Sequence, residues 1–258
     1  MEPAFGTDIS VHNGKINWNT MIAGNVKFVF IRAKYGTFTD RRFAVNWPAA
    51  KAAGLLRGAY LFYRPANDVG TVEQAEAFVN LLGNDLGELP LVVDVEHDVR
   101  SDGSQITPPP FEVLEPNLRA CLERITQLAG RRPIIYTAAG YWNEFLGALD
   151  WAPGYDLWAA NWVTTWTPSS RPFLPNAWTT YRFWQYAADG NAQGPNLGVE
   201  SPDIDLNLFN GDLDALLAYA NASSLVAASR GVQTEAVPEL HVTKAGATLR
   251  SQPVSTKH

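Results

Sequence analysis

The segment "LPLVVDVEHD" (residues 89–98) places two carboxylic acids directly after a run of apolar residues. Side chains alternate along a β-strand, so Asp94 and Glu96 share one face and stand about 6.6 Å apart along the strand. At that spacing each carboxyl group influences the pKa of the other, because a nearby like charge disfavours ionisation. The pair is therefore suited to acid–base chemistry, with one group donating a proton and the other carrying negative charge.

Two further acids, Asp8 in "FGTDISVHNG" and Asp205 in "PDIDLNLFNG", also stand at predicted strand ends. The C-terminal strand ends of a parallel barrel gather around one rim, which holds the active site. One such acid could be a loop cap, but four around one rim indicate a catalytic site. Glycosidic bond cleavage fits, because it needs a proton for the leaving oxygen and negative charge near the anomeric carbon. We expect Glu96, nearer the mouth, to donate the proton and the deeper Asp94 to stay ionised.

The elements that must position these acids alternate along the chain. Helices are predicted at 42–53, 71–82, 111–129 and 212–221, and strands at 5–11, 28–34, 58–63, 89–96, 133–138, 156–162, 181–187 and 204–209. Strand–helix alternation indicates a parallel sheet, and eight strands favour a closed barrel. Segments 163–180 and 188–202 are rich in Pro, Gly, Asn and Thr without a helical period. We therefore expect an α/β fold: an irregular, incomplete (β/α)8-type (TIM-like) barrel with loops replacing some helices in its second half.

Composition and charge exclude several classes of protein. The net charge is -6 and no basic run exceeds two residues, which argues against nucleic-acid binding. No apolar stretch approaches the roughly 18 residues of a membrane-spanning helix, so no membrane insertion is expected. The single cysteine, Cys121, excludes an intrachain disulfide and lies in an amphipathic helical pattern, which predicts a buried thiol. Nothing in the sequence indicates an obligate protein partner.

Eight blocks of the chain together resemble glycoside hydrolase family 25, the Chalaropsis-type lysozymes or N-acetylmuramidases, over about residues 5–215. They are "GTDISVHNGKINW", "FVFIRAKYGT", "FAVNWPAAKAAGLLRGAYLFYRP", "PLVVDVE", "PIIYTAAGYW", "LWAANW", "FWQYA" and "DIDLNLFNG". The resemblance implies an irregular barrel, no metal or cofactor, and hydrolysis of the β-1,4 bond between N-acetylmuramic acid and N-acetylglucosamine. Its substrate would be the glycan strands of bacterial peptidoglycan.

The resemblance also implies roles for individual residues. Glu96 matches the general acid and Asp94 its partner, while Asp8 and Asp205 match flanking acids that orient the substrate and tune the pair. Four more positions match residues that line the groove in such enzymes: Tyr63, Tyr136, Trp162 and Gln185. For Trp162 and Gln185, rim packing and a strand-end hydrogen bond are equally good interpretations.

The chain departs from its relatives at two places, neither of which touches the four acids. Leu61 stands in "AYLF" where many relatives have "AYHF", and Tyr35 in "RAKYG" stands where others have a glutamate. Two mechanisms stay open for Asp94. It could attack the anomeric carbon directly, or it could stabilise an oxazolinium formed by the substrate's own N-acetyl group. The Asp-X-Glu strand end resembles chitinases that use the second route, which we favour.

Two rival functions remain on the sequence alone. A non-catalytic peptidoglycan- or chitin-binding barrel would need the aromatic residues but not the four acids. A metal-dependent hydrolase could use "DVEHD" and His12, but His97 should point away from Asp94 and Glu96. We therefore expect a packed or solvated role for each histidine and no metal site.

The sequence also indicates how the chain is divided and where it acts. Residues 1–221 are expected to form the catalytic barrel, and residues 222–258 a linker and the possible truncated start of a wall-binding module. The N-terminal "MEPAFGTDIS" lacks the basic start and apolar run of a secretory signal. We expect the protein to act extracellularly or at the cell wall. A phage endolysin would instead be made in the host cytoplasm and released to the wall.

Overall fold

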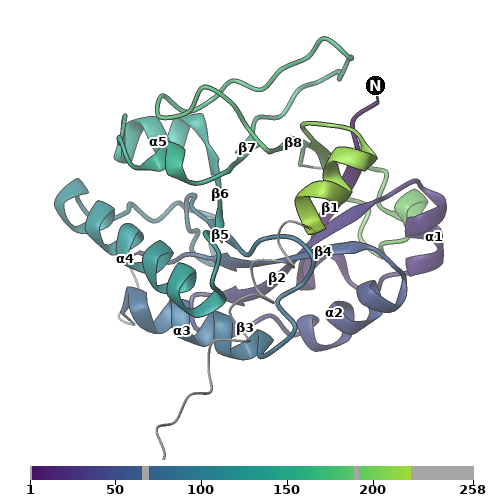
Figure 1. The fold of residues 1–258 in the computed structure, drawn as a ribbon, viewed down its shortest axis with the longest axis horizontal. Helices are drawn as coiled ribbons and strands as arrows, with labels where there is room; N and C mark the ends of the chain where they lie inside the picture. Colours follow the sequence, from purple (N-terminus) through teal and green to yellow (C-terminus); the bar gives the residue numbers. More distant parts are fainter. Residues whose placement is uncertain (1, 66–69, 189–191, 222–258) are drawn as a thin grey trace, which may run out of the picture.

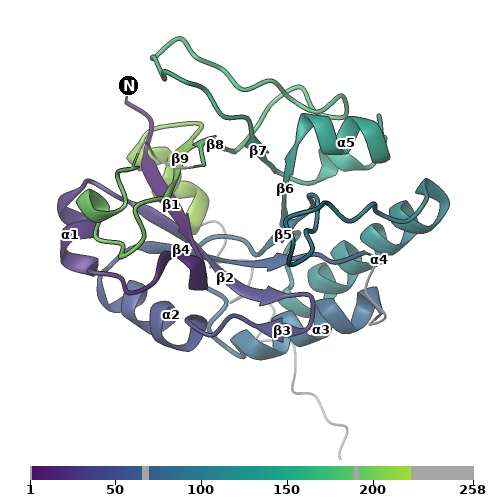
Figure 2. The ribbon, with the colours of Figure 1, turned by 180° about the vertical axis from the view of Figure 1, so that it is seen from behind.

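The computed structural model describes residues 2–65, 70–188 and 192–221, which form a closed eight-stranded barrel (Figures 1 and 2). The barrel closes because β1 pairs with β2 on one side and with β9 on the other. In order around it run β1 (Phe5–Ile9), β2 (Phe28–Tyr35), β4 (Leu56–Phe62), β5 (Val92–Asp94), β6 (Ile134–Ala138), β7 (Leu157–Ala160), β8 (Phe183–Ala187) and β9 (Asp205–Phe209). The two-residue β3 (Phe38–Thr39) forms a hairpin with β2. The predicted TIM-like barrel is confirmed.

The direction of the last strand differs from the predicted parallel arrangement. β9 is antiparallel to both of its neighbours, β8 and β1. A parallel return needs a crossover long enough to carry the chain back to the far end of the barrel, and segment 188–204 contains no α-helix to do so in its described part. Asp205 is therefore the first residue of its strand, not the last. It still lies at the rim that holds the ends of the parallel strands, directly opposite Asp8.

Helices lie around several sides of the barrel (Figure 1). The longest elements, α2 (Phe43–Ala52), α3 (Thr71–Leu82) and α4 (Phe111–Ala129), follow the first strands, with the shorter α1 (Trp18–Ala23) and α5 (Ala139–Phe145) beside them. Three-residue 3-10 turns lie at Val11–Asn13, Ala152–Gly154 and Pro195–Leu197. Segment 163–180 contains no helix, as its composition predicts. No helix in the described residues combines the length and apolar character needed to cross a membrane.

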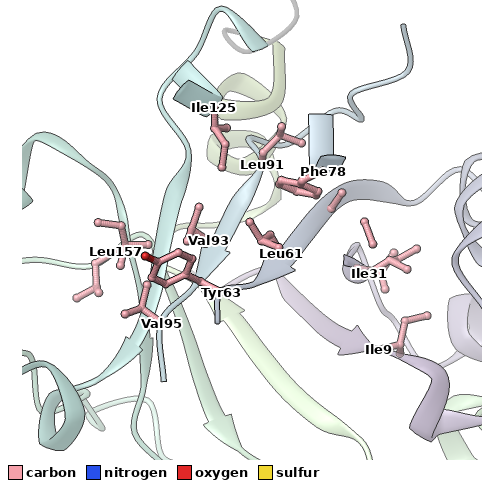
Figure 3. Packing of buried hydrophobic residues seen from close by; sticks show 14 of the residues in the cluster. Ile9, Ile31, Leu61, Tyr63, Phe78, Leu91, Val93, Val95, Ile125 and Leu157 are labelled. Atoms are coloured by element: carbon pink, nitrogen blue, oxygen red, sulfur yellow. The ribbon is translucent and has the colours of Figure 1, made fainter. Parts of the chain in front are cut away.

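Two apolar cores follow from the alternation of side chains along the strands. Outward-facing residues such as Leu61 and Val93 pack against α3 and α4, for example against Phe78 (Figure 3). Cys121 belongs to this outer core and is fully buried, as predicted, and burial raises the pKa of its thiol to about 12. Inward-facing residues, mostly aromatic, fill the barrel itself.

Glycine makes room for the aromatic residues inside the barrel. A Cβ atom on Gly58 would lie 2.4 Å from ring carbons of Phe30, and one on Gly6 would lie 2.5 Å from the ring of Phe28. The Phe30 ring in turn stacks on Trp158, with 4.3 Å between ring centroids. Small residues thus alternate with large ones so that a narrow barrel can be filled.

A final helix closes one end of the barrel. Residues 213–221 are helical, and Leu216 and Ala220 pack against Phe28, Phe183 and Phe209. Those phenylalanines lie at the first residue of β2 and β8 and the last residue of the reversed β9, so this end is the floor. The opposite end, where the acids lie, stays open. Residues 222–258 lie outside the described residues, so the predicted domain boundary at 221 stays a prediction.

Candidate active site

The four predicted acids gather at the open end of the barrel. Asp8 lies near the end of β1, Asp94 ends β5, Glu96 follows two residues later, and Asp205 begins β9. All four line one cavity of about 330 Å³. The convergence arises because seven strands run towards this rim and the eighth starts from it.

Glu96 also lines a second cavity of about 660 Å³ beside the first. The two cavities share four residues, His12, Arg32, Phe62 and Glu96, so Glu96 stands where they meet. The first cavity is deep and acidic. The second is broader and more apolar, with the exposed side chains of Phe38, Val99 and Trp162 at its edge. A chain of sugar rings lying through both cavities would place one glycosidic bond beside Glu96.

Burial sets the ionisation of the central pair. It raises the pKa of Glu96 from 4.5 to about 7, and the charge of Asp8 adds to the rise. Burial also raises the pKa of Asp94 well above its ordinary value, with contributions from Glu96 and Asp8 and an opposing one from Arg32. Glu96 thus holds a proton near neutral pH, as a general acid must.

The depth of Asp94 in the barrel acts against its ionisation, contrary to the expectation from the sequence. A deeper position was expected to keep this carboxyl ionised, yet depth removes it from water and raises its pKa. Its Oδ1 atom is buried without a hydrogen-bond partner among the described residues. The nearby guanidinium of Arg32, which pairs with Asp40 at 2.9 Å, favours the ionised form of Asp94 instead. An N–H donor on a substrate would do the same.

Asp8 is held by two side-chain amides. Its Oδ2 atom accepts hydrogen bonds from Gln185 Nε2 at 3.0 Å and Asn207 Nδ2 at 2.7 Å. Asn207 is oriented in turn by Trp158, whose indole N–H donates to its Oδ1 at 2.8 Å. Burial raises the pKa of Asp8, while these amide bonds, and one involving Asp205, act to lower it. The carboxyl group is thereby fixed at the base of the cleft.

Gln185 connects three of the groove residues proposed from the sequence. Its Oε1 accepts hydrogen bonds from Tyr136 Oη and from Trp162 Nε1, each at 2.9 Å, while its amide nitrogen donates to Asp8. Tyr136 and Gln185 line the first cavity, and Trp162, 60% exposed, stands at the edge of the second. For Trp162 and Gln185, both interpretations therefore apply: they line the cleft and hydrogen-bond to each other.

The prediction that Tyr63 lines the groove is wrong. Its side chain is 1% exposed and packs in the outer core with Leu61 and Val93 (Figure 3). Its hydroxyl accepts a hydrogen bond from Thr71 in α3. The alternation along β4 explains this placement, because Tyr60 and Phe62 line the first cavity and the residues between and after them must face outwards. Leu61 also faces outwards, so this departure from the family pattern lies outside the cleft.

Five residues in or beside the cleft were not predicted from the sequence. Arg32, Tyr60, Phe62, Trp158 and Asn207 were not singled out, although all but Asn207 line the first cavity and Asn207 orients Asp8. The alternation of side chains along a strand could have identified two of them, Asn207 and Tyr60. Asn207 follows Asp205 by two residues and Tyr60 precedes Phe62 by two, so alternation places each pair on one face.

Of the two histidines in this region, His97 is packed against aromatic rings and His12 is exposed. The ring of His97 packs edge-on against Tyr141 and Phe145, at 4.9 and 5.5 Å between centroids, on the side of the second cavity. His12 lies where the two cavities meet, and burial lowers its pKa. Within residues 2–65, 70–188 and 192–221, no three His, Cys, Asp or Glu side chains are placed to hold a metal ion together.

Comparison with known proteins agrees with this arrangement. Residues 7–195 match the model of the family described as Glycosyl hydrolases family 25. Lysozyme M1 of Streptomyces globisporus is 34% identical over 225 residues, covering 84% of this chain and 71% of that protein. The crystal structure of a bacterial lysozyme from Streptomyces coelicolor superposes with a TM-score of 0.72 and 31% identity, over 86% of this chain and 99% of the other.

A fungal enzyme gives a similar result. The muramidase from Trichobolus zukalii superposes with a TM-score of 0.69 and 28% identity, over 85% of this chain and 99% of that one. The family match includes Asp8, Asp94 and Glu96 and ends before Asp205. The chain is a glycoside hydrolase, and it belongs to glycosyl hydrolase family 25.

Proposed function

We propose that this chain is a lysozyme, an N-acetylmuramidase that hydrolyses the β-1,4 bond between N-acetylmuramic acid and N-acetylglucosamine in bacterial peptidoglycan. The observation that carries the proposal is Glu96, a partly buried carboxyl group with a pKa of about 7 at the junction of two cavities. The names of Lysozyme M1 and of the Trichobolus muramidase support it. The protein would accordingly act at the cell wall.

In this proposal Glu96 is the general acid. It gives its proton to the glycosidic oxygen as the bond from that oxygen to the anomeric carbon breaks. The sugar retained in the first cavity then carries positive charge at its anomeric carbon, close to the acids on the cavity wall. The leaving sugar lies in the second cavity, where the exposed ring of Trp162 offers a flat face to a pyranose.

Asp94 is proposed to stabilise the intermediate. The acetamido oxygen of the retained sugar attacks the anomeric carbon, and the acetamido N–H donates to the unpartnered Oδ1 of Asp94. That hydrogen bond favours the ionised carboxylate, which offsets the charge of the oxazolinium ring. Water then adds to the anomeric carbon and returns a proton to Glu96. Direct attack by Asp94 is the other route, and the two differ in whether the substrate needs an N-acetyl group.

Asp8, Asp205, Tyr136 and Gln185 are proposed to bind the retained sugar. Asp8 is fixed by the amides of Gln185 and Asn207, so its carboxylate has a set direction at the base of the cleft. Rigid polar groups of this kind hold a substrate in a reactive geometry without reorganising during the reaction.

The test is the identity of the new reducing end. Purified peptidoglycan digested by the enzyme and reduced with borohydride should yield muramicitol. Recovery of glucosaminitol instead would make the enzyme a glucosaminidase and contradict the assigned bond. Binding to peptidoglycan with no release of reducing ends would show a binding barrel without catalysis.

A further inference from the structure

A bulge in β2 determines which side chain reaches the cleft beside Glu96. The pairing of β2 with β4 runs Arg32 with Tyr60 and then skips a residue, so that Lys34 pairs with Leu61 and Tyr35 with Phe62. Paired residues of neighbouring parallel strands face the same side of a sheet. The skipped residue thus turns Lys34 to the outer side and brings Tyr35 to the cleft side, where it lines the second cavity.

Tyr35 is held there on several sides. Its ring packs against Phe62, with 4.9 Å between centroids, and the guanidinium carbon of Arg64 lies 4.5 Å from the ring centroid. Its hydroxyl donates a hydrogen bond to Oδ1 of Asp98. Burial and Asp98 raise the pKa of Tyr35 above its ordinary value of 10, so the hydroxyl keeps its proton and can donate at neutral pH.

Asp98 joins this cluster to the loop that follows Glu96. Its side chain is 7% exposed, and its Oδ2 accepts a 2.7 Å hydrogen bond from Arg64 Nε. Its Oδ1 also accepts from the backbone N–H of Val99, and its carbonyl oxygen accepts from the N–H of Ile106. One residue therefore ties together β2, the end of β4 and both ends of loop 98–106. Val99 and Gln105 of that loop line the second cavity.

Glu96 lies between two points of attachment. The last sheet hydrogen bond before it runs from Val95 N to Tyr136 O at 2.9 Å, and Asp98 is the next residue tied to another strand by its side chain. The residues between, Glu96 and His97, extend beyond the end of β5. The direction of the Glu96 carboxyl group therefore depends on where Asp98 is held.

We propose that Tyr35, Asp98 and Arg64 form a clamp that positions Glu96 for proton transfer to the leaving oxygen. This inference rests on the proposed role of Glu96 as the general acid. The three are positioning residues, because none of them lies at the reacting atoms. Loss of the clamp lets the strand extension move towards solvent, which displaces the proton donor and rehydrates its carboxyl group.

The substitution Tyr35→Phe tests the clamp with the smallest change, because it removes the hydroxyl and keeps the ring against Phe62. We expect kcat on peptidoglycan to fall about 10-fold, the scale of loss when a catalytic group is displaced by a fraction of an ångström. KM should stay within about twofold, because no group that binds the retained sugar changes. On an aryl glycoside with a nitrophenol leaving group, which needs no proton, the loss should nearly vanish.

The pH profile supplies a readout that a purely structural role would not move. A displaced Glu96 is better hydrated, its pKa falls, and the alkaline limb of kcat should move down by about half a unit or more. Titration of the Glu96 carboxyl by ¹³C NMR should show the same shift. The charged groups that share the two cavities with Glu96 remain unchanged in this variant: Asp8, His12, Arg32, Asp40, Arg41, Asp94, His97, Asp98, Asp203 and Asp205.

The matched control is Tyr186→Phe, which removes a hydroxyl from a partly buried tyrosine outside both cavities. It should leave kcat and the pH profile unchanged. A double-mutant cycle of Tyr35→Phe and Asp98→Asn should give a combined loss smaller than the product of the single losses, because both changes break one hydrogen bond. Multiplied losses, an unmoved limb, or a rise in KM alone for Tyr35→Phe would each overturn the clamp.

Failure of the clamp can be told from failure of the proposed function. The wild-type enzyme is assayed first for muramic acid at the new reducing ends, and that result alone decides the reaction. The NMR titration of Glu96 in wild type and Tyr35→Phe needs no substrate. An unchanged Glu96 pKa in an active enzyme overturns only the clamp.

Discussion

At the scale of single residues, Asp94 and Glu96 carry the same carboxyl group but lie in different surroundings. Glu96 stands where the two cavities meet, while Asp94 ends β5 inside the first, and its Oδ1 has no hydrogen-bond partner in the described part of the chain. A group at the junction can reach the bridging oxygen, whereas a group within the first cavity faces the retained sugar. Their proposed roles therefore predict different dependence on the leaving group.

The prediction at this scale compares two isosteric variants. Glu96→Gln removes the transferable proton, so activity on peptidoglycan should fall about 10²–10⁴-fold and recover largely on an activated aryl glycoside. The alkaline limb near pH 7, which reports loss of the Glu96 proton, should disappear. Asp94→Asn should impair both substrates comparably, because the intermediate needs stabilising whatever group leaves.

Steady-state kinetics of both variants on both substrates would check this. Wild-type enzyme measured on the same substrates gives the reference ratio. Rescue of Asp94→Asn by the good leaving group, with no rescue of Glu96→Gln, would mean that the two roles are reversed.

At the scale of elements, β4 needs a glycine at position 58, because the aromatic side chains inside the barrel leave no room for a Cβ atom there. An added Cβ would meet the Phe30 ring at 2.4 Å, and that ring stacks on Trp158 and is fully buried, so it has little room to move. Gly58→Ala should lower the free energy of unfolding by about 1–3 kcal/mol, the usual effect of overpacking. Urea unfolding followed by tryptophan fluorescence would measure it.

A second glycine provides the control for this experiment. Gly140 lies in α5, where an added Cβ would meet no atom of the described residues within 4 Å apart from its chain neighbours and the backbone of its own helix, and its φ is not positive. Gly140→Ala should raise stability by about 0.5–1 kcal/mol, because alanine restricts the unfolded chain and favours a helix. Equal effects of the two substitutions would contradict the packing argument.

At the scale of the whole molecule, the chain closes its own barrel before residue 222. Helix 213–221 buries Leu216 and Ala220 against the floor, and we therefore predict that the barrel core is complete without residues 222–258. Deletion of residues 222–258 should leave the melting temperature nearly unchanged, along with activity on soluble glycan fragments. Calorimetry of both forms would test this, and a fall of several degrees would show that the tail is part of the barrel. A deletion from residue 213 should unfold it.

Strand periodicity predicted much of this molecule because it depends only on neighbours in the chain. The "DVE" spacing placed Asp94 and Glu96 at one rim, and the runs without helical period predicted the loops of the second half. The same rule, applied from Tyr60 onwards, would have turned Tyr63 away from the cleft. Its misplacement came from the family resemblance.

Other features depend on contacts that no local pattern contains. The reversal of β9 follows from a missing crossover helix, which a strand of five residues does not signal. The bulge that brings Tyr35 into the cleft is visible only as a skipped partner between β2 and β4. The raised pKa of Asp94 depends on how completely the barrel covers its carboxyl group. Its position along one strand does not contain that information, and the prediction that it stays ionised therefore had the pKa shift in the wrong direction.

The burial of Glu96 has a thermodynamic consequence for the whole fold. Its carboxyl group has a pKa of about 7 in the folded protein against an ordinary value of 4.5. Between those pH values the folded protein keeps a proton that the unfolded chain has released, so unfolding releases protons. By linkage, the contribution of Glu96 to stability is complete below about pH 4.5 and is lost as the pH rises to 7. The raised pKas of Asp8 and Asp94 act in the same direction. These acids therefore shift the pH of greatest stability towards the acid side. At neutral pH, where Glu96 is about half ionised, most of its contribution to the stability of the fold has been lost.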